Sequence, residues 1–222
     1  MQALHCTEER SLRRTVAALA LLGVVVAGHA ADLGESTGLE FSNDRLAPTP
    51  WLLDASVPAP GGPDLYANVL TGTIGRSMTG VVDRDYVSFV VPAGYFLTAL
   101  RVGSQTSAGG AQGSFIGLAA GATMPVDPGA SSAAGLLGWR LYSAADATLD
   151  ILPSMGVPSQ GSTGFIAPLP EGTYTLWMQE LATGSFTYRF NLVISPVPEP
   201  AAWLLFGGGL LALRAAARAR RT

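Results

Sequence analysis

The side chains that could do chemistry in this chain are mainly carboxylates. Asp83 and Asp85 are two positions apart in the stretch DRDYVSFVV, and in a β-strand this spacing places both on one face. Together with Asp127 or Glu171 they could bind a hard cation such as Ca²⁺ through oxygen ligands. Calcium loops usually carry oxygen ligands at closer spacing, so the sequence favours turn carboxylates over a metal site.

Carboxylate pairs could also hydrolyse glycosides, because two distant strands can bring such residues together. Asp146 and Asp150 in SAADATLD are better interpreted as turn residues. In any β-sandwich rich in acidic residues, some two carboxylates can be chosen as a hypothetical catalytic pair, so the existence of such a pair is weak evidence for an enzyme. We therefore expect no catalytic residue and no required cofactor, with calcium as the alternative.

One tryptophan is a candidate for contact with a ligand. In GTYTLWMQEL, Thr175, Trp177 and Gln179 share one strand face, which is more polar than the face of Tyr174 and Met178. Flat aromatic rings stack on sugar rings, so Trp177 is the residue to test for carbohydrate binding. Core packing is the alternative for every aromatic residue of the chain.

The N-terminus predicts an export signal. Arginines precede an uncharged run from Thr15 to Gly28, and small residues at Gly28 and Ala30 suit cleavage by signal peptidase after Ala30. Both histidines and the only cysteine lie before that point, and the chain has no lysine. The exported part therefore lacks Cys–His zinc sites, disulfides, Ser-His-Asp triads and Schiff-base lysines.

The exported body is acidic. Residues Asp32 to Val197 contain 13 acidic residues and six arginines, which gives a net charge of −7. Such a surface repels phosphate backbones, so we expect no nucleic-acid partner.

The middle of the chain alternates apolar and polar residues in short runs, with Gly and Pro between them. DRDYVSFVV is followed by Pro92-Ala93-Gly94 and a second strand from Tyr95 to Val102. Further strands are expected in SFIGLAAG, GWRLYSA, GTYTLWMQEL and SFTYRFNLVI, the last two joined as an antiparallel hairpin through residues 182–185. The prediction is an all-β, antiparallel β-sandwich of seven to nine strands.

Three of these stretches resemble the bacterial pre-peptidase C-terminal domain. They are DRDYVSFVVPAG with the following LTALRV, LGWRLYSAADATL, and LPEGTYTLWMQELATGSFTYRFNLVI. The resemblance covers roughly residues 71–194 and implies a small secreted jelly-roll-like sandwich. The loose segment AAGATMPVDPGASSAAG departs from that pattern.

The C-terminus carries a second apolar run. Ala201 to Leu213 are thirteen uncharged residues, about 20 Å as a helix, and extension past Arg214 brings the helix closer to the ~30 Å membrane core. The side chain of Arg214 then reaches the membrane interface, and the positive-inside rule keeps Arg218, Arg220 and Arg221 on the cytoplasmic side. These membrane-stop residues are Arg214, Arg218, Arg220 and Arg221.

Pro198, Glu199 and Pro200 precede this run, and the stretch VPEPAAWLLFGGGLLALRAAARAR resembles the PEP-CTERM sorting signal. The resemblance implies processing by exosortase, a membrane transpeptidase of Gram-negative bacteria that make exopolysaccharide. The prolines keep Glu199 out of the helix. The segment around Glu199 is therefore expected to be extended at the membrane face, where a protease can bind it.

The predicted organisation is a signal peptide (residues 1–30), an extended Pro-rich segment (31–70), a β-sandwich domain (71–195) and a sorting signal with a transmembrane helix (196–222). We expect an exported protein, anchored transiently in the inner membrane and then surface-bound or extracellular. Its expected partners are signal peptidase, exosortase and exopolysaccharide. The predicted role is non-catalytic, in the surface or biofilm matrix; the alternatives are a calcium-assisted carbohydrate-binding module and a secreted carboxylate hydrolase.

Overall fold

The structure is a computed structural model that describes residues 32–35, 39–56, 59, 66–109 and 112–198. Almost all regular structure in these residues is β-strand, and the helical pieces are η1 (Ala144–Asp146) and α1 (Leu152–Met155). The strands are β1 (Leu33–Gly34), β2 (Thr49–Leu52), β3 (Tyr66–Arg76), β4 (Val82–Val91), β5 (Tyr95–Val102), β6 (Ser114–Ala120), β7 (Gly138–Tyr142), β8 (Gly172–Gln179) and β9 (Gly184–Pro196).

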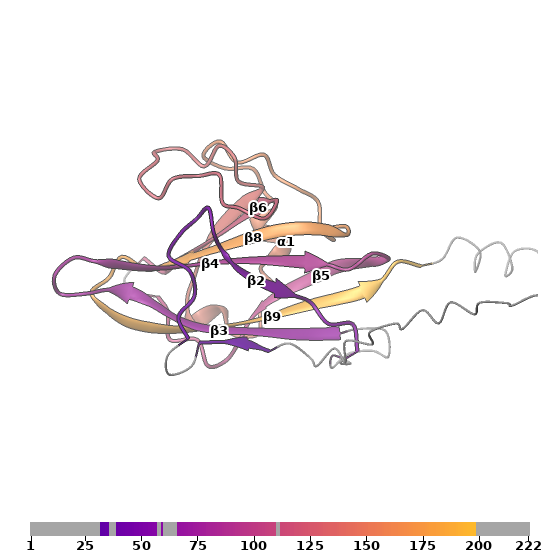
Figure 1. Cartoon of the computed structure of the whole chain (residues 1–222), viewed down its shortest axis with the longest axis horizontal. Helices are drawn as coiled ribbons and strands as arrows, with labels where there is room; N and C mark the ends of the chain where they lie inside the picture. The colour runs from indigo at the N-terminus through magenta and orange to yellow at the C-terminus, as the bar shows by residue number, and fades with distance from the viewer. Residues whose placement is uncertain (1–31, 36–38, 57–58, 60–65, 110–111, 199–222) are drawn as a thin grey trace, which may run out of the picture.

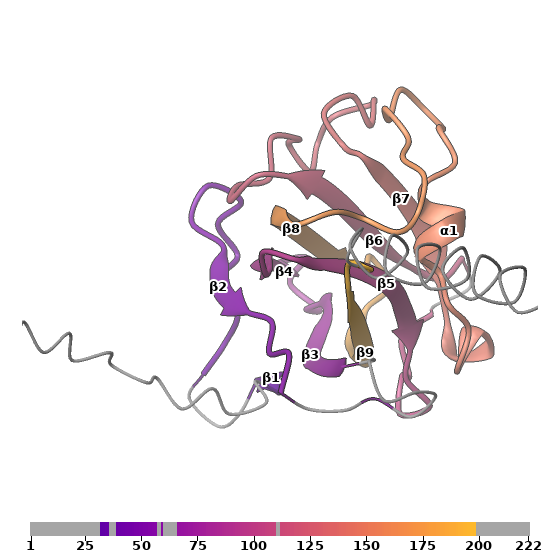
Figure 2. The ribbon, with the colours of Figure 1, turned by 90° about the vertical axis from the view of Figure 1, so that its right-hand side faces the viewer.

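The strands form one sheet that folds over on itself, in the order β5-β9-β3-β4-β8-β6-β7. Among the described strands, its two halves pair with each other where β3 meets β4, at Gly75 with Asp83 and at Arg76 with Val82. Away from this hairpin β3 runs antiparallel to β9, and β4 runs antiparallel to β8. The halves β5-β9-β3 and β4-β8-β6-β7 therefore separate and face each other (Figures 1 and 2).

The segment around α1 lies between the two edge strands β5 and β7. The Ile151 N–H donates to the Leu100 carbonyl in β5, at 2.8 Å. On the other side the Met155 carbonyl approaches Gly138 of β7 so closely that a Cβ on Gly138 would lie 1.9 Å from the carbonyl oxygen. Both edges are thus covered, and the sheet is nearly closed.

The hydrophobic core fills the space between the two halves. In β4 the residues Val87, Phe89 and Val91 point inward, as the alternation of the sequence predicts. The remaining strands of the two halves also contribute inward-facing side chains. Among these are Leu70, Ile74, Leu97, Leu100, Ile116, Leu118, Leu176, Phe190, Leu192 and Ile194. The chain has no disulfide to rely on in this region, so burial of these side chains is its main source of stability.

One strand connection differs from the sequence prediction. β8 and β9 do not form a hairpin, because β8 pairs with β4 and β6 while β9 pairs with β3 and β5. The link through residues 182–183 instead crosses from one half to the other, beside the β3–β4 hairpin. There Gly75 and Gly184 pack backbone to backbone: a Cβ on Gly75 would lie 1.9 Å from the Gly184 carbonyl oxygen. β4 and β5, joined by Pro92-Ala93-Gly94, likewise belong to opposite halves.

The predicted Pro-rich segment contributes strands of its own. β2 pairs in parallel with β4, with Trp51 buried in the core and Leu52 exposed. β3 begins at Tyr66, so the boundary predicted between residues 70 and 71 falls inside a strand.

The all-β class and the mostly antiparallel pairing are confirmed. Among the described residues, no helix has the length and hydrophobicity that a membrane crossing needs. The predicted signal peptide and C-terminal membrane helix lie outside the residues that the structure describes.

Candidate functional site

Most of the predicted sorting residues lie outside the described part of the chain. These are Ala30, Glu199, Pro200, Arg214, Arg218, Arg220 and Arg221. The last described residue is Pro198, which is exposed and lies two positions after the end of β9. The Val197 N–H donates to the Gly94 carbonyl at 2.7 Å, so the backbone is held to the body up to this point.

Asp83 and Asp85 share one face of β4, but they do not meet at a common site. Asp83 lies at the surface, where the Asn43 amide donates to its Oδ1 at 3.0 Å. Asp85 is fully buried, because from this position onward the face points into the core. Its Oδ2 accepts a 2.7 Å hydrogen bond from the Tyr188 hydroxyl, and its Oδ1 has no hydrogen-bond partner among the described residues.

The burial of Asp85 changes its protonation. Burial raises the pKa of Asp85 to about 8, the Tyr188 hydrogen bond opposes this, and the charges of Glu35 and Asp83 add to the rise. Burial also raises the pKa of Tyr188 well above its ordinary value. Asp85 is therefore largely protonated at neutral pH, and a protonated carboxyl is a poor ligand for a cation.

The other carboxylates considered for a metal site are engaged elsewhere. Glu171 accepts a hydrogen bond from the Gly94 N–H at 2.8 Å, and Asp127 lies 3.9 Å from the Arg45 guanidinium. Within the described ranges, no three residues among His, Cys, Asp and Glu group together in a way that could hold a metal ion. The predicted set of Asp83 and Asp85 with Asp127 or Glu171 is thus not assembled.

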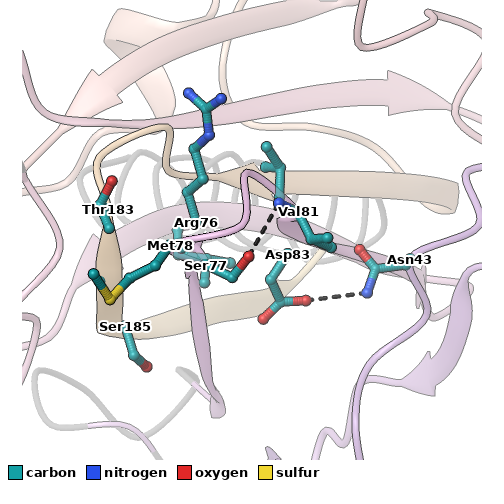
Figure 3. Close-up of a pocket in the computed structure, with 12 residues that line it drawn as sticks. Asn43, Arg76, Ser77, Met78, Val81, Asp83, Thr183 and Ser185 are labelled. Carbon is teal, nitrogen blue, oxygen red and sulfur yellow. Dashed lines mark hydrogen bonds between the residues drawn. The ribbon is translucent and has the colours of Figure 1, made fainter.

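Asp83 instead borders a cavity of about 450 Å³ at the β3–β4 hairpin (Figure 3). Arg76 and Asp83 are its charged residues, and the Asn43 side chain lies beside Asp83. Met78 and Val81 at the hairpin are strongly exposed. The hairpin turn is closed by the Val81 N–H, which donates to the Ser77 Oγ at 3.0 Å. This cavity offers one cation and one anion on an open, partly apolar rim.

Trp177 lies on the outer face of β8, as the alternation predicts. It is nevertheless buried, with an exposed fraction of only 6%. The segment after β6 covers it with Met124, Val126 and Leu136. Its ring packs on Phe115, with ring centroids 4.6 Å apart, and on Tyr86 at 5.9 Å.

A cavity of about 190 Å³ lies beside Trp177. Phe115 and Trp139 line it on the aromatic side, and Asp127, Ser132 and Gln160 on the polar side. The Trp177 Nε1 is buried and has no hydrogen-bond partner among the described residues. An indole N–H is a donor only, so only an acceptor that reached this buried atom would satisfy it.

Sequence reasoning did not identify Tyr188 as the partner of Asp85. The signal was present in SFTYRFNLVI, where Tyr188, Phe190 and Leu192 alternate on the inward face. A tyrosine directed into the core needs a polar partner for its hydroxyl, so an inward carboxyl was a reasonable candidate.

The comparisons with known proteins concern the C-terminus alone. A family model described as the PEP-CTERM protein-sorting motif matches residues 196–221. Searches of curated proteins and of solved structures found no match to this chain. The motif confirms the sorting signal predicted from Pro198, Glu199 and Pro200. It marks an exported protein that is anchored transiently in a membrane and processed by exosortase.

Proposed function

We propose that this exosortase substrate is a non-catalytic protein of the cell surface or extracellular matrix, associated with exopolysaccharide or biofilm. The observation that supports the proposal most strongly is the PEP-CTERM motif at residues 196–221. The motif begins at Pro196, the last residue of β9, so the sorting signal directly follows the last described strand. In this scheme signal peptidase acts first, after Ala30, and exosortase acts later, in a Gram-negative bacterium.

A structural role for the carboxylates supports the non-catalytic part of the proposal. Asp85 binds Tyr188, Asp146 pairs with Arg140, and Glu180 accepts a 2.6 Å hydrogen bond from Ser114. These groups hold strands and turns together, and each is partly or fully buried. A glycoside hydrolase would instead present two carboxylates to one open cleft.

The sorting step is tested by Glu199→Ala and by deletion of residues 218–222. Each change should leave unprocessed protein in the inner membrane, which fractionation and immunoblotting would detect. Glu40→Ala is the matched control, because Glu40 is exposed on the body of the protein. Normal release of both altered proteins would refute processing through this signal.

The matrix role needs a separate experiment. The released protein should fractionate with the matrix in a strain that makes exopolysaccharide and appear in the medium of a strain that does not. An unchanged distribution between the two strains would remove the exopolysaccharide part of the proposal.

The cavity beside Trp177 supports one alternative function, a carbohydrate-binding module. Its aromatic wall could stack on a sugar ring, and a sugar hydroxyl that reached the buried Trp177 Nε1 would accept its hydrogen bond. Trp177→Phe keeps an aromatic ring and removes the N–H, so glycan binding should weaken without loss of the fold. Binding to a glycan array that is insensitive to Trp177→Phe would refute this site, and a calcium titration of the same array would separate the calcium-assisted version.

The jelly-roll-like sandwich and the relation to the pre-peptidase C-terminal domain also belong to the proposal. The support is a nearly closed antiparallel sheet whose two halves face each other, and an Asp-bearing strand, β4, beside a Gly-x-Tyr strand, β8.

A further inference from the structure

A third cavity lies on the outer face of the β5-β9-β3 half, far from Trp177 in the strand order. Its volume is about 420 Å³, within the ~300–1,000 Å³ range of small-molecule sites. We call it the arginine groove, and define it by Arg101, Ser104, Thr148, Arg189, Asn191 and Val193.

Strand register brings two arginines to the same side of this groove. Arg101 in β5 lies opposite Asn191 in β9, and Arg189 lies two positions before Asn191. The alternate residues of both strands, Val102 and Phe190 among them, point into the core, so both arginines point outward. Diagonal neighbours of this kind lie ~7–8 Å apart, close enough for two guanidinium groups to reach one anion.

Among the described residues, neither arginine forms an ion pair. In the described residues, the ion pairs join Arg45 with Asp127 and Arg140 with Asp146. Asp150 pairs with Arg101 through the backbone, but its carboxylate accepts hydrogen bonds from the N–H groups of Leu100 and Leu152 at 3.0 and 3.1 Å.

The side-chain contact made by Arg189 is weak. Its Nη1 lies 3.4 Å from Gln105 Oε1, near the limit for a hydrogen bond. The guanidinium therefore keeps most of its five donors for a ligand.

Gly103 fixes the path of the Arg189 side chain. Gly103 faces Arg189 across the strands, and its N–H donates to the Arg189 carbonyl at 2.7 Å. A Cβ on Gly103 would lie 2.6 Å from Arg189 Cγ, 2.7 Å from Cδ and 2.8 Å from Cβ. The stem of Arg189 thus lies directly on the glycine backbone, which restricts its conformations before any ligand binds.

The rest of the groove suits a sugar. Its floor contains small apolar side chains, Ala67, Val69 and Val193, which leave room for a flat ring. Ser104, Thr148 and Asn191 add hydroxyl and amide groups that can bond sugar hydroxyls.

The charges of groove and body together select the kind of anion. The planar guanidinium fork matches a carboxylate with two parallel hydrogen bonds. The net charge of −7 from Asp32 to Val197 disfavours a densely charged polyphosphate or nucleic acid. A sugar chain with one carboxylate per ring carries its charges farther apart than a polyphosphate does, so the acidic body repels it less.

We infer that the arginine groove binds the carboxylate of an acidic, uronate-type saccharide through Arg101 and Arg189. This inference rests on the proposed extracellular role and names the ligand class for it.

Binding would be measured by calorimetry with the purified full chain in non-ionic detergent. The probe is a galacturonate hexamer, and its methyl ester keeps the rings while it removes the charge. Arg101→Gln and Arg189→Gln should each weaken binding about tenfold or more, since each removes a charge-assisted contact. The ester should bind at least about tenfold more weakly than the acid.

Two variants distinguish binding in the arginine groove from non-specific attraction of the anion by exposed arginines. Arg76→Gln removes one exposed arginine at the β3–β4 hairpin and should leave affinity unchanged. Gly103→Ala keeps every charge but displaces the Arg189 stem, so it should also weaken binding about tenfold. If Gly103→Ala does not fold, the two Arg→Gln variants still decide the matter.

Absence of binding, equal binding of acid and ester, or an equal loss in Arg76→Gln would overturn the inference. Equal binding of inorganic polyphosphate, lost in the same variants, would overturn the carboxylate assignment. The measurement uses unprocessed protein, so a failure of exosortase processing would refute the proposed function without altering this result.

Discussion

The buried carboxyl of Asp85 should make the stability of this protein depend on pH. Burial raises its pKa to about 8 in the folded chain, whereas in the unfolded chain it titrates near its ordinary value of 3.8. Between these two values the folded chain keeps a proton that the unfolded chain has lost. The free energy of unfolding therefore falls as the pH rises from about 4 to about 8, and the stabilisation is complete only at acid pH.

The size of this effect follows from the difference between the two pKa values. Each unit is worth about 1.4 kcal/mol, so a difference of about four units corresponds to a loss of up to about 6 kcal/mol. That loss is large beside the 5–15 kcal/mol by which typical domains are stable. Asp85→Asn removes the titrating carboxyl, so the free energy of unfolding of this variant should change much less between about pH 4 and about pH 8.

The measurement is urea unfolding of the full chain in non-ionic detergent, followed by tryptophan fluorescence between about pH 4.5 and about pH 8.5. Asp32→Asn is the matched control, because Asp32 is an exposed carboxylate that should leave the pH profile unchanged. The reasoning is refuted if the wild-type protein is equally stable at both ends of the range, or if Asp85→Asn shows the same fall as the wild type.

Three further substitutions test the packing. Gly75→Ala should destabilise the protein by about 1–3 kcal/mol or more, because the new Cβ would overlap the Gly184 carbonyl oxygen; an unchanged urea midpoint would contradict the close approach. Trp177→Ala should cost about 3–5 kcal/mol, since it empties a buried aromatic site, and a thermal melting curve like that of the wild type would show that the residue is not buried. Arg140→Ala removes a partly buried ion pair with Asp146 and should cost about 1 kcal/mol in urea unfolding, with a smaller difference between the two proteins at high salt.

The sequence predicts strand positions well and strand neighbours poorly. Alternation and the turn at Pro92-Ala93-Gly94 locate β4 and β5 closely, because they depend only on local geometry. The partner of each strand depends on which half of the sheet it joins, and an alternating pattern looks the same in either half. This is why a hairpin was expected between β8 and β9.

In the candidate site, too, the sequence predicts the strand face of a residue but not what packs against it. The spacing of Asp83 and Asp85 correctly places both on one face, but the sequence does not reveal that this face enters the core at Asp85. Trp177 is on the outer face as expected. Its cover comes from residues 124–136, in a segment of small residues whose own pattern carries no packing signal.

The position of β9 bears on how the protein reaches its folded state. β9 is the last strand of the described chain, yet it lies between β5 and β3, and its pairing with β3 links residues more than a hundred positions apart. Contacts of such long range form slowly, and until they form β3 and β5 are open edges that can recruit other chains. Pro198, Glu199 and Pro200 follow β9, so a cut at these residues leaves β9 whole. Release after β9 has paired would therefore free a body in which the edges of β3 and β5 are already covered.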